Sequence, residues 1–125
     1  MKIIKKKMDL KNKLAIVTGA SSGIGSEFSK KLIDKGATVY GLARSTDKLN
    51  QFQTKFGQQF KPVQMDITRH TDIDTWVNKT FSDDHQPDIL INNAGVAYFG
   101  DVDEIPVEEW ESMINTNLNG VFYLT

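Results

Sequence analysis

The stretch Thr18-Gly19-Ala20-Ser21-Ser22-Gly23-Ile24-Gly25 decides the fold of this 125-residue chain. It follows a short apolar run, residues 14–18, and precedes apolar residues at helical spacing. Gly19 permits a sharp turn, Gly23 lets the backbone approach a phosphate, and Gly25 lets a helix pack closely on a sheet. We therefore predict a strand, a glycine-rich turn and a helix whose first N–H groups bind the pyrophosphate of a dinucleotide.

The spacing of these glycines is Gly-x-x-x-Gly-x-Gly, and no Lys-Ser or Lys-Thr pair follows it. This argues against the phosphate loop of nucleoside triphosphatases. Two serines add hydroxyl donors to the N–H groups at the start of the helix. The cofactor contacts expected from the turn are Gly19, Ser21, Ser22, Gly23, Ile24 and Gly25.

Strand-like runs alternate with helix-like stretches over the rest of the chain. Residues 14–18, 38–42, 60–65 and 88–91 are predicted as four strands, and the alternation is typical of parallel βαβ units. Because such crossovers are right-handed, the first three strands should lie in the order 3-2-1, with the fourth on the far side of the first. The sequence therefore predicts a Rossmann-type doubly wound α/β sheet of order 3-2-1-4, incomplete after its first four βα units, with the cofactor over the carboxyl ends of the strands.

Apolar residues at helical spacing predict four helices, each with one apolar face. The faces are Ile24, Phe28 and Leu32; then Leu49, Phe52 and Phe56; then Ile73, Trp76, Val77 and Phe81; and last Trp110, Ile114, Asn117 and Val121. We expect both tryptophans to lie in the core. Pro62 has no N–H to donate, so we expect the third strand to pair mainly from Val63 onward.

The composition fits a single globular domain, with 39% hydrophobic residues, 25% charged residues, a net charge of -1 and no cysteine. The charge favours neither nucleic acid nor a membrane, and the lack of cysteine excludes thiolate metal sites and fits the cytoplasm. The basic start precedes no apolar run of signal-peptide length. We expect a basic, mobile tail over residues 1–12 and the domain over residues 13–125. His70 and His85 show no metal-ligand pattern, so no metal is expected.

The residues after the second strand bear on the choice of cofactor. An NAD site of this fold usually has an acidic residue there, which binds the ribose 2′-hydroxyl. This chain instead has Ala43 and Arg44. A neutral residue does not repel a 2′-phosphate, and a guanidinium binds one with two hydrogen bonds, with Ser45 as a further donor. We therefore predict NADP rather than NAD, bound by Arg44 and Ser45.

Four motifs together resemble the short-chain dehydrogenase/reductase family. They are the glycine-rich turn at residues 18–25, Asp66-Ile67, Asn92-Asn93-Ala94-Gly95 and Asn117-Leu118-Asn119-Gly120. They cover nearly the whole chain, which is similar to the N-terminal half of a family member. The resemblance implies that Asp66 contacts the adenine amino group, assisted by the backbone of Ile67. It also implies that Asn92 is mainly structural, while Asn93, Ala94 and Gly95 line the site near the cofactor ribose.

Asn117 stands on the apolar stripe of the last predicted helix, where an amide is costly unless it is paired. The resemblance identifies Asn117 as the asparagine of the catalytic tetrad, whose backbone holds a water that links the active-site lysine to solvent. Asn115 and Asn119 lie off the stripe, and we expect them to face solvent or a neighbouring subunit.

The resemblance further implies hydride transfer that uses a Ser to orient the substrate carbonyl, a Tyr as general acid/base and a Lys that lowers the pKa of that Tyr. No Tyr-x-x-x-Lys motif occurs in the chain, so we expect a partial domain that does not catalyse turnover alone. For the complete protein we expect an NADP-dependent oxidoreductase acting on a small carbonyl or alcohol substrate, as a homodimer or homotetramer. A non-catalytic dinucleotide-binding module and an epimerase or dehydratase on the same fold are the alternatives.

Overall fold

A computed structural model describes residues 8–125, and within them it has four strands and five α-helices. The strands are β1 Leu14–Thr18, β2 Thr38–Ala43, β3 Phe60–Gln64 and β4 Ile89–Ile91. The helices are α1 Gly23–Asp34, α2 Thr46–Phe56, α3 His70–Thr80, α4 Val107–Ile114 and α5 Gly120–Leu124. A short 3-10 turn, Gly57–Gln59, follows α2, and a π-helical turn, Asn115–Asn119, joins α4 to α5.

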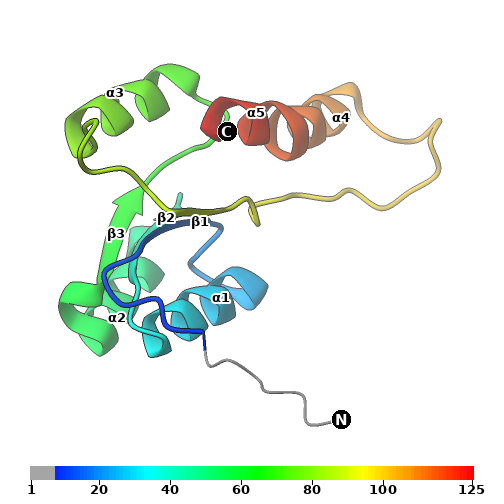
Figure 1. The fold of residues 1–125 in the computed structure, drawn as a ribbon. Helices are drawn as coiled ribbons and strands as arrows, with labels where there is room; N and C mark the ends of the chain where they lie inside the picture. The colour runs from blue at the N-terminus through cyan, green and yellow to red at the C-terminus, as the bar shows by residue number, and fades with distance from the viewer. Residues whose placement is uncertain (1–7) are drawn as a thin grey trace, which may run out of the picture.

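The strands form one parallel sheet in the order β3-β2-β1-β4, as predicted. β1 lies inside the sheet, with Leu14 opposite Thr38 of β2 and Ala15 opposite Ile89 of β4. α1 and α2 cover one face of the sheet, whereas α3, α4 and α5 lie on the other (Figure 1). The helices after β1 and β2 thus lie on one face of the sheet, and those after β3 and β4 lie on the other. Doubly wound sheets bind their ligands where the connections change face, which here is beside the neighbouring strands β1 and β4.

The core has two halves, because neighbouring residues of a strand point to opposite faces of the sheet. Ala15 and Val17 pack in the half that α1 and α2 cover, while Ile16, Tyr40 and Leu42 pack in the half below α3 and α5. The predicted helix faces formed by Leu49, Phe52 and Phe56 and by Ile73, Trp76, Val77 and Phe81 lie in the first and second half, respectively. Both faces are therefore confirmed.

The pairing of β3 differs from the prediction. β3 pairs with β2 from its first residue, Phe60 opposite Val39, so the expected start at Val63 was wrong. β3 lies at the edge of the described sheet, and a proline is tolerated in a strand that has one unpaired side. Pro62 consequently leaves the ladder intact.

The face of α1 that contacts the sheet also differs from the predicted one. Ile24 is 70% exposed and Phe28 is 42% exposed, whereas Gly25, Ser29 and Ile33 are buried. Gly25 and Ser29 are small and let the helix lie close to the sheet, and the Ser29 hydroxyl donates to the carbonyl of Gly25 at 2.9 Å. Each buried residue of α1 therefore lies one position after the residue that the apolar spacing predicted to be buried.

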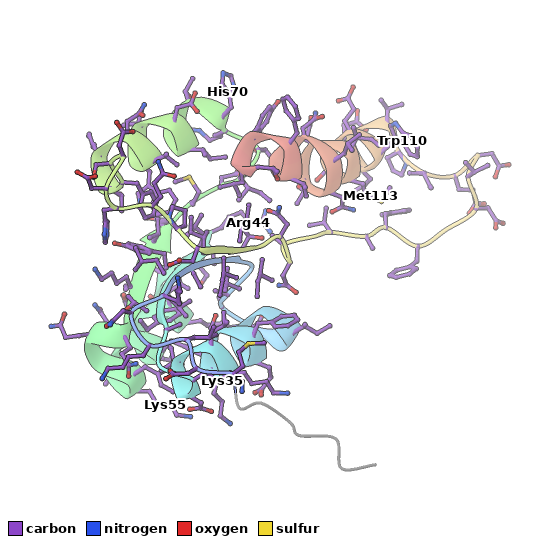
Figure 2. The ribbon with its side chains drawn as sticks, viewed as in Figure 1. Lys35, Arg44, Lys55, His70, Trp110 and Met113 are labelled. Carbon is purple, nitrogen blue, oxygen red and sulfur yellow. The ribbon has the colours of Figure 1, made fainter. Side chains whose placement is uncertain are left out.

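The two tryptophans occupy different environments. Trp76 packs against Tyr40 and Phe81, with ring centroids 5.8 and 5.3 Å away, and so lies in the core as predicted. Trp110 is 52% exposed on α4, and its predicted core position was wrong (Figure 2). α4 extends beyond the sheet in Figure 1, so this side of the helix has no described layer to pack against.

Leu10, which falls within the tail predicted for residues 1–12, is hydrogen-bonded to the end of α1. The N–H of Leu10 donates to the carbonyl of Lys35 at 2.8 Å, and Lys13 N–H donates to the carbonyl of Leu10 at 3.0 Å. Those bonds anchor the segment to the end of α1. Residues 1–7, the rest of the predicted tail, lie outside the described residues. None of the described helices is long and apolar enough to cross a membrane.

Candidate functional site

A cleft of about 540 Å³ lies over the carboxyl ends of β2 and β3, beside the turn that follows β1. The loop after β4 and the π-helical turn form its other wall. Parallel sheets of this order bind ligands at this edge. The volume falls within the usual range for small-molecule sites. The cleft is therefore the candidate site.

The glycine-rich turn brings the start of α1 to the cleft. Gly19 and Gly23 have φ angles of 63° and 54°, a region that favours glycine. Ser22 is the N-cap residue, but its side chain makes no capping hydrogen bond. Within residues 8–125 the N–H groups of the first helical turn thus have no side-chain acceptor, and the positive end of the helix dipole adjoins the cleft wall formed by Ser21 and Ser22. This arrangement suits an anion.

Gly25 lies beneath the turn, where α1 meets it. A Cβ atom at this position would overlap the carbonyl oxygen of Gly19 and lie 2.5 Å from Nδ2 of Asn93. No side chain fits there without moving the backbone of the turn. Gly25 therefore fixes the packing of α1 against the turn rather than lining the cleft.

Thr18 and Asn93 tie β1 to the segment after β4. The backbone N–H groups of Asn93 and of the next residue both donate to Oγ1 of Thr18 at 2.9 Å. Nδ2 of Asn93 donates to the carbonyl of Thr18 at 3.0 Å and to that of Gly19 at 3.5 Å. Asn92 is exposed, and its Nδ2 donates to Oγ1 of Thr125 at 3.3 Å, so both asparagines make structural contacts and Asn93 makes those that hold the turn. The alternation of side chains along an extended chain turns Asn93 toward β1 and Asn92 away from it.

Arg44 and Ser45 follow β2 and line the cleft with exposed side chains. The Gln64 amide donates to the carbonyl of Arg44 at 3.2 Å and steadies the backbone from which the guanidinium extends. Arg44 forms no ion pair within residues 8–125. It also borders a second cavity of about 690 Å³ between β3 and α3. Its donors are therefore available to an anion in the cleft.

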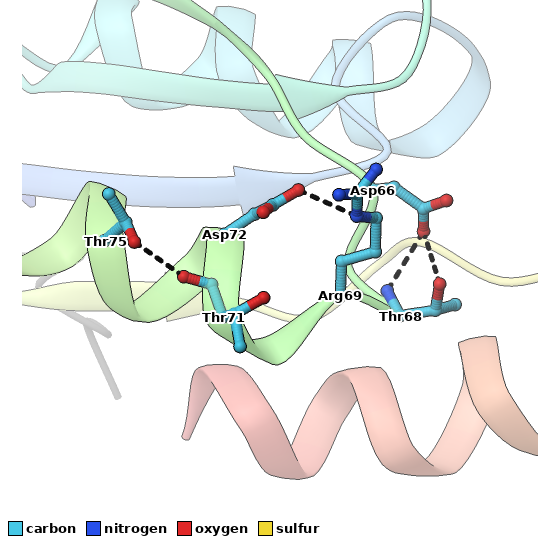
Figure 3. Close-up of polar contacts among 6 residues, drawn as sticks. All are labelled: Asp66, Thr68, Arg69, Thr71, Asp72 and Thr75. Carbon is cyan, nitrogen blue, oxygen red and sulfur yellow. Dashed lines mark hydrogen bonds and ion pairs between the residues drawn. The ribbon is translucent and has the colours of Figure 1, made fainter.

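The carboxyl of Asp66 is held by Thr68 at the end of β3 (Figure 3). Oδ1 of Asp66 accepts hydrogen bonds from Thr68 N–H at 3.0 Å and from Thr68 Oγ1 at 2.8 Å. Partial burial raises the pKa of this carboxyl, but the two bonds from Thr68 and the charges of Arg44 and Arg69 outweigh it and leave the pKa lowered. Asp66 is thus an ionised hydrogen-bond acceptor in the cleft wall.

Asn117 holds the loop after β4 through its side chain. Oδ1 accepts a hydrogen bond from Val96 N–H at 2.9 Å, and Nδ2 donates to the carbonyl of Val96 at 2.8 Å. Asn117 lies in the π-helical turn, and such turns are frequent at functional sites. The wider turn changes the direction of its side chains. Asn115, expected to face solvent or a neighbouring subunit, accordingly lines the cleft.

The structure brings most of the predicted site residues together. Those that line the cleft are Gly19, Ser21, Ser22, Arg44, Ser45, Asp66, Ile67, Ala94 and Gly95. Those outside its lining are Gly23, Ile24, Gly25, Asn93 and Asn117. Sequence reasoning missed Leu42, Met65, Thr68, Ser112 and Thr116, as well as Val96. Of these, only Thr68 could have been found from the sequence, because an aspartate side chain often accepts a hydrogen bond from the backbone N–H two residues later.

Within residues 8–125, no three His, Asp or Glu side chains gather as a metal site would require. His70 and His85 are exposed. The His70 ring packs against Tyr123, with centroids 5.4 Å apart, and His85 stacks on Phe81 at 6.3 Å. Neither histidine lines the cleft.

Comparison with known sequences matches residues 13–125 to the model of the short chain dehydrogenase family. An uncharacterized oxidoreductase from Staphylococcus epidermidis is 33% identical over 115 residues, which are 92% of this chain and 50% of that protein. The 3-oxoacyl-(acyl-carrier-protein) reductase of Escherichia coli is 34% identical over 118 residues, 94% of this chain and 48% of that one. The chain thus spans about half the length of the curated relatives it matches.

Solved structures share the fold. A short chain dehydrogenase from Bacillus anthracis is 33% identical with a TM-score of 0.84, covering 92% of this chain and 47% of its own. A serine dehydrogenase in complex with NADP+ is 29% identical, with a TM-score of 0.83 and coverages of 89% and 45%. A 3-ketoacyl-(acyl-carrier-protein) reductase from Brucella melitensis in complex with NADH is 29% identical, with a TM-score of 0.86 and coverages of 93% and 48%.

Proposed function

Because this chain belongs to the short chain dehydrogenase family, we propose that the whole protein is an oxidoreductase that moves hydride between NADP and a small carbonyl compound or secondary alcohol. The observation that carries the proposal is the glycine-rich turn before α1, whose Gly19, Ser21 and Ser22 line the cleft together with Arg44. The names of the curated relatives support the reaction class over an epimerase or a dehydratase. NADPH oxidation by the whole protein with aldehydes and ketones tests it; no turnover with any of them would contradict it.

The size and the donors of the cleft fit a dinucleotide. A pyrophosphate needs N–H and hydroxyl donors and a positive field, which the start of α1 supplies. The proposed contacts are Gly19, Ser21, Ser22, Gly23 and Ile24 for the pyrophosphate, with Gly25 serving that site by holding α1 against the turn. Asp66 and Ile67 are proposed for the adenine, and Asn93, Ala94 and Gly95 for the ribose side. A nicotinamide bound there supplies or accepts the hydride.

Arg44 and Ser45 support NADP as the preferred cofactor. Both line the cleft directly after β2, and Ala43 leaves that position without a carboxylate. A 2′-phosphate there would meet a guanidinium that has no ion-pair partner within the described residues. The solved relatives include complexes with NADP+ and with NADH, so the preference rests on these residues rather than on the comparisons.

The other residues of the chain would orient the cofactor and hold the cleft in shape. Both polar atoms of the Asn117 side chain bind Val96. Because the side chain is occupied in this way, its contacts support the proposal that the Asn117 backbone, rather than its side chain, holds the water next to the active-site lysine. We assign proton transfer to no residue of this chain, because neither Tyr40 nor Tyr98 has a lysine four positions later.

The variant Arg44→Asp of the whole protein tests the cofactor preference. A hydrogen bond to a charged group is worth about 1.5–3 kcal/mol, so the affinity for NADP+ should fall by about tenfold or more. The affinity for NAD+ should rise, because the new carboxylate can accept the ribose 2′-hydroxyl. Isothermal titration calorimetry with the two cofactors measures both changes.

Lys48→Asp is the matched control, since Lys48 is an exposed cation on α2 that lines neither cavity. It makes the same change of charge near the site and should leave the ratio of affinities within about twofold, because exposed charges interact weakly across water. If Arg44→Asp left the ratio unchanged as well, Arg44 would have no part in choosing the cofactor.

We further propose that the protein acts in the cytoplasm as a homodimer or homotetramer. Trp110, Leu118 and Phe122 are 52%, 61% and 79% exposed on the helices from α4 to α5, and such apolar exposure supports a subunit contact. Light scattering after size-exclusion chromatography of the whole protein measures the subunit number. A monomer at micromolar concentration would contradict the assembly, and recovery of the protein outside the cytoplasm would contradict the location.

A further inference from the structure

Asp66 presents its two carboxylate oxygens differently. Oδ1 accepts both bonds from Thr68, whereas Oδ2 accepts no hydrogen bond within residues 8–125. Figure 3 shows Oδ2 pointing away from Thr68. Asp66 lines both the cleft and the second cavity beside Arg69, so this free acceptor stands at the border of the candidate site. An ionised carboxylate offers no donor, so Oδ2 suits a ligand group that donates.

Arg69 is the neighbour that could occupy this acceptor. Its positive charge acts on Asp66, together with that of Arg44, and guanidinium–carboxylate pairs form readily. The structure does not pair Arg69 with Asp66. Instead Nε of Arg69 binds Oδ2 of Asp72 at 2.9 Å, one helical turn along the chain (Figure 3). Asp72 therefore holds the guanidinium that would otherwise compete for the Asp66 carboxylate.

We propose that Thr68 and Asp72 are positioning residues that reserve Oδ2 of Asp66 for the exocyclic amino group of the adenine. Thr68 fixes the orientation of the carboxylate, and Asp72 keeps Arg69 away from it. This inference rests on the proposed function, because it requires that the cleft bind an adenine dinucleotide. It makes the site selective for a 6-amino purine, which donates to Oδ2, over a 6-oxo purine, whose oxygen faces the carboxylate.

The test compares NADP+ with nicotinamide hypoxanthine dinucleotide phosphate, in which an oxygen replaces the adenine amino group. Isothermal titration calorimetry on the whole protein gives the ratio of the two dissociation constants. The wild-type protein should bind the adenine form about tenfold more tightly or better, because one ligand makes a charge-assisted hydrogen bond and the other opposes two acceptors. A structural defect would weaken both ligands equally and leave this ratio unchanged.

Thr68→Val should reduce the ratio to about threefold, because valine keeps the shape of threonine but not the hydroxyl that holds Oδ1. Thr68→Ser restores the hydroxyl and should restore the ratio. A Thr68→Val protein with the wild-type ratio would overturn the role of Thr68.

Asp72→Ala should also reduce the ratio, because Arg69 is then free to pair with Asp66. Removal of Arg69 as well, in the double variant Arg69→Ala/Asp72→Ala, should restore the preference. Asp74→Ala is the matched control, since Asp74 is an exposed acid on the same helix and should leave the ratio unchanged. A wild-type ratio in Asp72→Ala, or a double variant as impaired as the single one, would overturn the role of Asp72.

The wild-type measurement separates this inference from the proposed function. Equal binding of both dinucleotides would overturn the inference and leave dinucleotide binding intact. Binding of neither would overturn both.

Discussion

Replacement of Thr18 by valine would test the anchor on which the glycine-rich turn depends. Thr18 is 1% exposed, and its Oγ1 accepts two backbone N–H bonds at 2.9 Å from the segment after β4. Valine has nearly the same shape but no acceptor. An unsatisfied buried donor costs about 1–3 kcal/mol. Because the two donors are only partly buried, we expect the free energy of unfolding to fall by about 2–3 kcal/mol.

The assay is urea unfolding of the whole protein, followed by tryptophan fluorescence, since Trp76 lies in the core next to Tyr40. The midpoint should move to lower urea while the slope stays constant, because the surface exposed on unfolding is unchanged. Thr18→Ser is the control, since serine keeps the hydroxyl but loses the methyl group. If Thr18→Val were within about 0.5 kcal/mol of the wild type, the two bonds would not be holding the turn.

Three further predictions concern other contacts. Gly25→Ala should lower stability by about 1–3 kcal/mol, because the new methyl group overlaps the carbonyl of Gly19; an unchanged urea midpoint would contradict the close packing. The pKa of Asp88 is lowered, first by its hydrogen bond from Lys13, so the stability it contributes is present above pH about 4 and is lost as the pH falls through the folded pKa. The difference in urea midpoint between wild type and Asp88→Asn should therefore shrink on acidification; a constant difference would exclude the charge as its cause. Asn117→Asp should speed proteolysis of the loop after β4, because a carboxylate cannot donate to the Val96 carbonyl that the Asn117 amide binds. An unchanged cleavage rate would refute this.

The arrangement of the sheet could be predicted from the sequence because strand-like segments alternate with helix-like segments along the chain. The strand order then follows from the handedness of the crossovers, and the four strand-like segments needed no tertiary information. The buried faces of the helices could be predicted only in part. Leu49 and Ile73 are buried as apolar spacing predicts, but on α1 the close approach to the sheet selects Gly25 and Ser29, which a hydrophobicity pattern does not detect.

The parts of the site that sequence reasoning missed depend on backbone direction. Which of Asn92 and Asn93 points toward β1 is set by how β4 ends, and a neighbouring pair of identical residues gives no signal for that choice. The position of Asn115 depends on the π-helical turn, which a period of 3.6 residues cannot anticipate. The role of Arg69 depends on which of two nearby carboxylates it binds, and only the three-dimensional structure distinguishes Asp72 from Asp66.

The bonds between Thr18 and Asn93 have a consequence for synthesis of the chain on the ribosome. They join residues 75 positions apart, so every glycine of the turn is made long before the residue that anchors it. A nascent chain that ends at α3 has the turn but no support for it, and a long loop must close before that support arrives. A ligand held in the cleft would contact the segment after β4 as well as the turn, so its binding would stabilise the domain only after β4 has joined the sheet. Ligand binding at the cleft would thus stabilise only the late, assembled state and could not guide the first steps of folding.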